Sequence, residues 1–161
     1  MAETDLRGWA TSSMRPLHAV AVENPVYPGF PDIAYSLGLI EAKWVRKAPA
    51  RPGTAVAVEH YTKEQRDFAR AHAQAGGTVL MLLQVGREVF LISGRTAADR
   101  VGTATLEQIR EMAVEKWGKR PSPRGLICAV LRHSRPRLPS GLSFKDGELG
   151  KAWSTLPLST T

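Results

Sequence analysis

Cysteine, aromatic residues and long apolar runs are all scarce in this sequence. Of its 161 residues, one is cysteine and 7% are aromatic. The single thiol, Cys128, excludes an intrachain disulfide, and its place in the apolar stretch 126–131 predicts that it is buried. No run of eighteen apolar residues and no signal-peptide pattern occurs. We therefore expect a cytoplasmic protein that has no membrane partner.

Acidic residues are outnumbered, which favours a polyanionic partner. Lysine and arginine total 22 against 15 aspartate and glutamate residues, a formal net charge of +7. The excess is concentrated in the loop-like stretch 46–53 and in the stretch 116–145, which holds eight bases and no acid. Each stretch is either a solvated basic segment or a contact for a DNA backbone. The candidate DNA-binding residues are Arg46, Lys47, Arg51, Lys119, Arg120 and Arg124.

Residues 29–43 are predicted to form two short strands joined by a tight turn, because apolar runs flank Ser36, Leu37 and Gly38. Side chains of a strand alternate between its two faces. Either possible two-residue turn therefore places the three charges of this hairpin on one face, whereas a three-residue turn moves the first of them to the other face. These charged residues are Asp32, Glu41 and Lys43.

Charges on a buried strand are costly unless they are paired or bound to a metal. With a Ser36-Leu37 turn, Asp32 lies opposite Glu41, and with a turn one residue later it lies opposite Lys43. Two carboxylates beside an ammonium suit a hard divalent cation next to a phosphate, and the carbonyl of Ala42 offers a further ligand. The alternative is an ordinary solvent-facing pair of charges with an aspartate in a turn.

The hairpin residues also resemble a known family. Pro31-Asp32 followed, after eight residues, by Glu41-Ala42-Lys43 resembles the signature of the PD-(D/E)XK nuclease superfamily. Residues 1–94 resemble its small phage and archaeal members, the Holliday junction resolvases and the related VRR-NUC nucleases. The resemblance implies a prokaryotic or phage-infected host cell. It also implies an α/β, restriction-endonuclease-like core with a mixed central sheet of about five strands flanked by helices.

The same resemblance implies a catalytic set and a cofactor. The implied catalytic residues are Asp32, Glu41, Lys43 and Gln65. The implied cofactor is Mg²⁺, with Mn²⁺ as an alternative. Its expected ligands are Asp32, Glu41 and the carbonyl of Ala42, completed by either Glu3 or Glu23. Gln65 also fits a capping box with Thr62 at a helix start, and the sequence leaves both roles for this residue open.

The remaining elements follow from periodicity and turn residues. Helices are predicted at 3–13, 62–75 and 103–117. Strands beyond the hairpin are predicted at 17–23, 78–85, 88–92 and 126–131. We expect one nuclease domain over residues 1–131 and a basic extension rich in proline, serine and glycine over residues 132–161.

The expected function is metal-dependent hydrolysis of branched DNA, most strongly as a Holliday junction resolvase. Two opposed cuts in a four-way junction require two sites related by a twofold axis, which implies a homodimer. The alternatives are a flap- or duplex-nicking nuclease of the same superfamily, and a non-catalytic basic DNA-binding module.

Overall fold

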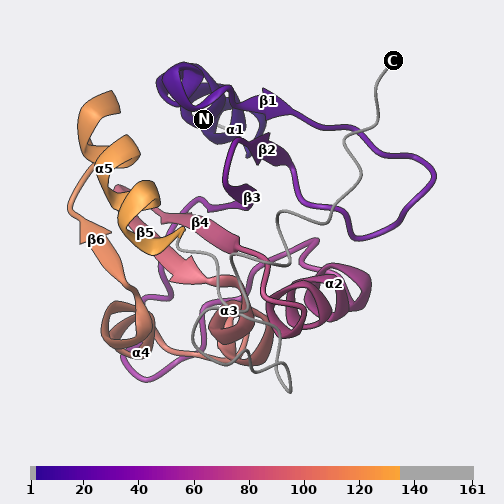
Figure 1. The fold of residues 1–161 in the computed structure, drawn as a ribbon. Coiled ribbons are helices and arrows are strands. Elements are labelled where there is room, and N and C mark those ends of the chain that lie inside the picture. Colours follow the sequence, from indigo (N-terminus) through magenta and orange to yellow (C-terminus); the bar gives the residue numbers. More distant parts are fainter. Residues whose placement is uncertain (1–2, 135–161) are drawn as a thin grey trace, which may run out of the picture.

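A single mixed β-sheet forms the centre of the molecule (Figure 1). The computed structural model describes the backbone of residues 3–134 and the side chains of residues 5–134. The six strands lie in chain order and are β1 (Val20–Ala21), β2 (Ile33–Tyr35), β3 (Gly38–Val45), β4 (Val79–Val85), β5 (Glu88–Ser93) and β6 (Glu115–Trp117). The helices are α1 (Glu3–Ser13), α2 (Lys63–Gln74), α3 (Gly94–Arg100), α4 (Leu106–Met112) and α5 (Pro123–His133), with a 3₁₀ turn at Arg15–Leu17.

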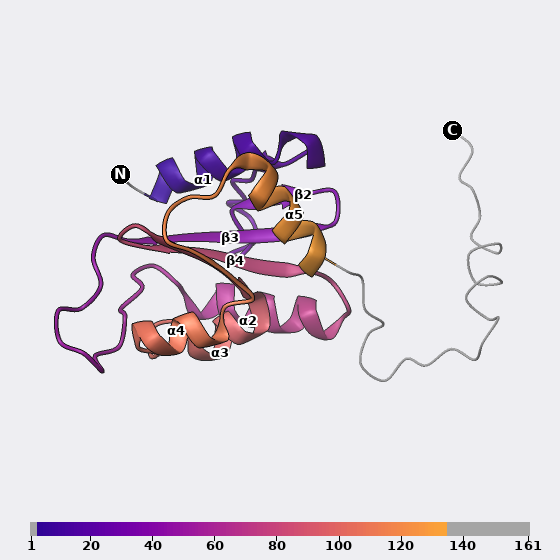
Figure 2. The ribbon, with the colours of Figure 1, turned by 90° about the vertical axis from the view of Figure 1, so that its left-hand side faces the viewer.

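Strands β3 and β4 are the parallel pair, and the other neighbouring strands are antiparallel. A parallel pair needs a crossover connection, which here contains α2. The sheet is covered on both faces: α1 and α5 lie on one side, and α2, α3 and α4 lie on the other (Figure 2). The long central strands β3 and β4 are therefore enclosed between two helical layers.

The alternation of side chains along β3 divides its residues between these two layers. Ile40 and Ala42 join the apolar core beneath α1 and α5. Glu41 and Lys43 point the opposite way, toward the side of α2, where their β4 neighbours Met81 and Leu83 belong to a second apolar core. The fold thus buries two charged residues in an apolar layer.

The predicted α/β class with a mixed central sheet is confirmed, and the sheet has six strands where about five were expected. The hairpin, the helix after it and the two central strands lie close to their predicted bounds. Among residues 3–134, no helix is both long enough and apolar enough to cross a bilayer.

The predicted strand at 126–131 is wrong, because this segment lies within α5. Ser122 caps the helix by accepting a hydrogen bond from the backbone of Gly125 at 3.1 Å, and Pro123 occupies a favoured first position. On a helix the apolar run is spread around several sides, so Cys128 is exposed and not buried as expected.

Two other predicted elements have wrong bounds, and one helix was missed. The helix expected at 103–117 is shorter, since it ends at Met112 and the chain then enters β6. Helix α3, capped by Ser93, was not predicted. The strand expected at 17–23 is reduced to two residues, because the 3₁₀ turn occupies its start.

The predicted boundary after residue 131 falls inside α5. Arg132 and His133 belong to that helix, and both side chains bond to Glu115 of β6. The rest of the predicted C-terminal extension, from residue 135, lies outside the described residues.

Candidate functional site

The hairpin between β2 and β3 uses the two-residue turn Ser36-Leu37. Its register pairs Ile33 with Ile40 and Tyr35 with Gly38. Continuing this register by one residue places Asp32 opposite Glu41, as one of the two open alternatives predicted. The prediction that the three hairpin charges share one sheet face is confirmed.

Glu41 and Lys43 are an ion pair buried in the sheet. Their residues are 4% and 2% exposed, and Lys43 Nζ lies 2.9 Å from Glu41 Oε1. A solvent-facing pair is therefore excluded. Charges at this depth carry a large desolvation cost, which a partner only partly offsets. The pair is consequently a weak contributor to folding and a candidate for function.

Gln65 of α2 reaches the same carboxylate from the helical layer. Its Nε2 donates a hydrogen bond to Glu41 Oε1 at 2.7 Å. At its other end, Oε1 accepts from the backbone N–H of Thr62 at 3.0 Å, and the Thr62 hydroxyl accepts from the backbone of Gln65. One side chain therefore caps the helix and bonds to Glu41, and its catalytic role stays a prediction.

Asp32 is held against β3 through the backbone. Its Oδ2 accepts a hydrogen bond from the N–H of Ala42 at 2.9 Å. The N–H and C=O of one strand residue point toward the same neighbour, so the Ala42 carbonyl also points toward the Asp32 side. The continued register places Pro31 opposite Ala42, and proline has no N–H to donate to that carbonyl. The proline thus favours a carbonyl oxygen that is available to a ligand.

Asp32 also raises the pKa of Glu41. Burial and the nearby Asp32 charge together raise the pKa of the Glu41 carboxyl to about 8, against the opposing effect of Lys43. Protonation of Glu41 relieves its repulsion with Asp32 when no cation is present. Glu41 Oε2 is buried and finds no hydrogen-bond donor within the described part of the chain.

A close contact at Gly29 brings the segment before Asp32 against the start of α2. Gly29 has a φ of 86°, and a Cβ built on it would lie 2.4 Å from the backbone carbon of Glu64. Only glycine tolerates both conditions. Nearby, Phe30 packs edge-on against Phe68 of α2, with ring centroids 5.3 Å apart. These contacts fix Asp32 and Gln65 relative to one another.

Tyr61 and Arg66 belong to this environment and were not predicted as site residues. Tyr61 is buried directly before the α2 cap, and burial, assisted by the Glu41 charge, raises the pKa of its hydroxyl to about 12. The Arg66 guanidinium lies 4.2 Å from the Tyr61 ring centroid and donates to the carbonyl of Ala98. The sequence did contain a signal for Tyr61: an apolar residue directly before a capping box often packs on the first turn of the helix.

Glu3 and Glu23 are the two glutamates that were expected to complete the metal site. Glu23 is 84% exposed at its side chain and lies 3.6 Å from Arg7, with which it forms an ion pair. It is not among the groups that contact Glu41. Glu3 begins α1, but its side chain lies outside the described residues. The structure therefore gives no support to Glu23 and leaves Glu3 open.

The predicted DNA-binding residues fall into two groups. Arg46, Lys47 and Arg51 are exposed on the segment that follows β3, as expected. Lys119 and Arg124 are exposed near the start of α5.

Arg120 has a structural role. It donates to Gln84 Oε1 at 3.0 Å and to Asp5 Oδ2 at 2.9 Å, and it lies over the ring of Trp9. These contacts tie α1 to the central sheet.

The acid pair fits a hard cation. The described residues contain no group of three or more histidine, cysteine or acidic side chains suited to a metal. A cation here would be held by Asp32, Glu41, the Ala42 carbonyl and water, and Mg²⁺ keeps several waters readily. The orphaned Glu41 oxygen and the repulsion between the carboxylates are both relieved by such an ion.

Comparisons of this chain with models of protein families, with curated proteins and with solved structures found no match.

Proposed function

We propose that this chain is a metal-dependent DNA endonuclease. The observation that carries the proposal is the cluster of Asp32, Glu41, Lys43 and Gln65, in which Glu41 and Lys43 are buried and one Glu41 oxygen has no donor among the described residues. The resemblance of the hairpin to PD-(D/E)XK nucleases supports the same assignment. Strongly perturbed carboxyl groups occur preferentially at functional sites.

Each residue of the cluster has a separate role in this proposal. Asp32, Glu41 and the Ala42 carbonyl hold the cation, which when bound polarises the scissile phosphate and lowers the pKa of a water molecule. Gln65 and Lys43 fix the Glu41 carboxylate by bonding to its Oε1. The Lys43 ammonium also stabilises the negative charge that develops on the phosphate oxygens as water attacks phosphorus and the leaving oxygen departs.

Branched DNA is the proposed substrate, with a four-way junction first. This choice rests on the resemblance to junction resolvases, and it entails a homodimer because two opposed strands must be cut. The exposed bases beyond β3 support DNA as the partner, since contacts to phosphates are independent of sequence. The resolvase and the flap- or duplex-nicking nuclease share one site, and cleavage of matched substrates distinguishes them.

The test is cleavage of end-labelled four-way junction, flap, duplex and single strand by the full chain, with Mg²⁺, Mn²⁺, Ca²⁺ or a chelator. We expect symmetric nicks in the junction with Mg²⁺ or Mn²⁺ and none with chelator. Asp32→Asn should abolish cleavage while junction binding in Ca²⁺ persists. The matched control is Asp99→Asn, because Asp99 is an exposed aspartate on α3 whose bond is to Arg70; this variant should cleave normally.

Other outcomes each overturn a defined part of the proposal. Uniform nicking of linear duplex would replace the resolvase by a duplex nuclease and keep the site. Binding without cleavage in any divalent metal would favour the non-catalytic DNA-binding module.

A further inference from the structure

Three chain segments that are distant in sequence meet at one end of the sheet. The turn between β4 and β5 is tied to the end of β3, because the Gly86 N–H donates to the Val45 carbonyl at 2.8 Å. Strand β6 reaches the same end, since its last residue, Trp117, pairs with Val89 near the start of β5. Figure 2 shows the chain leaving β3, and the connection to α5 passing, at this left-hand end of the sheet.

Two clefts open at this end. The first, of about 470 Å³, lies beside the end of β3 and is lined by Trp44, Val45, Arg46, Lys47, Ala57, Glu59 and His60. The second, of about 650 Å³, is lined by Arg87 of the β4–β5 turn and by the segment 116–122 between β6 and α5. Each cleft is therefore lined by one half-buried tryptophan and by at least two lysine or arginine residues, and the first cleft also contains Glu59.

The charge of the second cleft is unbalanced. Four of its lining residues are basic and none is acidic: Arg87, Lys116, Lys119 and Arg120. The first three are exposed. Arg120 is fixed in the cleft wall by its bonds to Gln84 and Asp5. A concentration of one sign of charge around a concave surface attracts a polyanion and raises its local concentration.

The two clefts are separated by the width of a few strands. From β3 to β6 the sheet order advances by three neighbours. At roughly 4.8 Å for each neighbour the clefts lie about 14 Å apart, a span covered by about four nucleotides at 3.4 Å each. The end of β3 that carries the first cleft follows Glu41 and Lys43 directly, so a strand lying along this end would reach the proposed catalytic cluster.

We propose that the two clefts form one track for the phosphate backbone of DNA, extending from the proposed active site to the loop before α5. The track rests on the proposed function. It adds Arg87 and Lys116 as phosphate contacts and places a tryptophan beside each cleft. Basic residues combined with aromatic side chains are typical of surfaces that follow a nucleic-acid strand.

The test measures binding without cleavage. Anisotropy of a labelled four-way junction, with chelator present and at several salt concentrations, gives the slope of log K against log salt for the full chain. Arg46→Gln/Lys47→Gln removes two bases from the first cleft, and Arg87→Gln/Lys116→Gln removes two from the second. The matched control is Arg95→Gln/Arg100→Gln, which removes two exposed bases from α3. Thermal unfolding checks that each variant folds.

Each cleft variant should reduce the magnitude of the salt slope by about 2, because a phosphate contact contributes about 0.9 to it. Affinity should fall roughly tenfold or more at moderate salt, and the α3 control should change less than threefold. A second-cleft variant that behaves like the control would overturn the track. Binding to anionic phosphatidylserine vesicles that needs Arg87 and Lys116, with an unchanged DNA slope, would overturn it in favour of a membrane surface.

The track and the proposed function fail separately. A smaller salt slope in both cleft variants, with no cleavage by the wild-type chain, would support the track and contradict the proposed nuclease activity. Cleavage of the junction with an unchanged slope in the second-cleft variant would do the reverse.

Discussion

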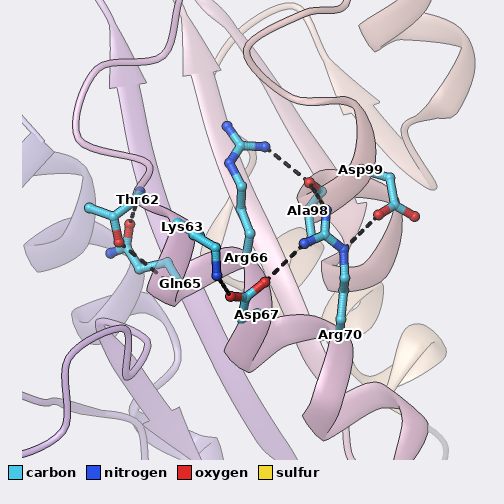
Figure 3. A network of polar contacts seen from close by, with 8 residues as sticks. All are labelled: Thr62, Lys63, Gln65, Arg66, Asp67, Arg70, Ala98 and Asp99. Atoms are coloured by element: carbon cyan, nitrogen blue, oxygen red, sulfur yellow. Dashed lines mark hydrogen bonds and ion pairs between the residues drawn. The ribbon is translucent and has the colours of Figure 1, made fainter.

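Helix α2 takes part in two polar networks that differ in whether their charges are balanced. The outer network faces solvent and joins α2 to α3 (Figure 3). Lys63 Nζ lies 2.5 Å from Asp67 Oδ2, and Arg70 Nη1 lies 3.2 Å from Asp67 Oδ1. Arg70 Nε lies 2.8 Å from Asp99 Oδ1. Arg70 also donates to the Ala98 carbonyl. Every charge in this chain of contacts has an opposite neighbour and access to water.

The inner network begins two residues along the same helix, at Gln65, and it combines two acidic side chains with one basic side chain around an ion pair that is closed off from water. Glu41 and Lys43 are almost completely buried. Asp32 adds a second negative charge, and Glu41 Oε2 lacks a donor within the described residues. Balanced surface pairs contribute little to stability and need no other explanation. A buried and unbalanced cluster costs stability, and such clusters persist at functional sites.

The largest predicted effect comes from removing one charge of the inner network. Glu41→Gln should reduce Mg²⁺-dependent cleavage by roughly a thousandfold or more, because the cation loses a charged ligand. The same variant should unfold no more easily than wild type at pH 8 without metal, because it removes the repulsion between Glu41 and Asp32 while the amide oxygen of the introduced glutamine can still accept from Lys43. Cleavage assays and urea unfolding measure the two effects. A variant that loses both cleavage and stability would mean that Glu41 is structural.

The pH dependence of stability should expose the same cluster. Glu41 has a folded pKa of about 8 and an ordinary value of 4.5. The stability that protonated Glu41 contributes is fully present below about pH 4.5, where the folded and the unfolded protein both bind the proton. Between about pH 4.5 and 8 only the folded protein retains the proton, so this stability is lost as the pH rises through about 8.

Without metal, the wild-type free energy of unfolding should therefore fall by a few kcal/mol over this range relative to Glu41→Gln. Urea unfolding at a series of pH values checks this difference. Mg²⁺ should stabilise wild type most at high pH, where the carboxylates are free to bind it. Parallel pH profiles for the two proteins would contradict the prediction.

The contact at Gly29 should be the most sensitive backbone position near the site. Gly29→Ala combines a positive φ with a clash against the backbone of Glu64, so we expect a loss of about 2–4 kcal/mol and reduced cleavage. Gly53→Ala is the matched control, because Gly53 has a φ of 76° and nothing lies within 4 Å of its added Cβ. It should lose only about 1 kcal/mol and cleave normally. Equal losses in chemical unfolding would mean that the α2 contact is unimportant.

The double role of Gln65 can be separated by a second capping box. Thr105 and Gln108 form the same motif at the start of α4, where Gln108 Oε1 accepts from the Thr105 N–H at 3.0 Å. Gln65→Ala and Gln108→Ala should each cost about 1 kcal/mol as lost caps. Only Gln65→Ala should also lower cleavage, by roughly tenfold to a hundredfold, because Glu41 loses a donor. Equal cleavage by the two variants would reduce Gln65 to a cap.

The sequence predicted that Asp32, Glu41 and Lys43 share one sheet face, because local geometry determines it. Alternation along the strands and a two-residue turn together specify which residues share a face, but which of the two possible turns forms, and so whether Asp32 lies opposite Glu41 or Lys43, was left open. The capping box of α2 was likewise a local pattern. The double role of Gln65 was out of reach, since it depends on the distance between the helix and β3.

The errors occurred where local patterns are ambiguous. The apolar run 126–131 has no clear period, and such short runs fit a strand or a buried helix equally. The Ser122-Pro123 start signal favoured the helix and was the better guide. Arg120 was grouped with exposed bases, although its partners Gln84 and Asp5 are 36 and 115 residues away. Contacts between residues so far apart in sequence cannot be predicted without the fold. The same holds for the cleft that Arg87 forms with segment 116–122.

The smallest predicted effect belongs to the outer network. Arg70→Gln removes the residue that links Asp67, Asp99 and the Ala98 carbonyl. Because these groups are exposed and screened by solvent and salt, the midpoint of urea unfolding should not change measurably, and cleavage should stay within about twofold of wild type. A marked loss of cleavage at unchanged stability would show that the outer network positions Gln65. The contrast between the two networks would then describe one connected system.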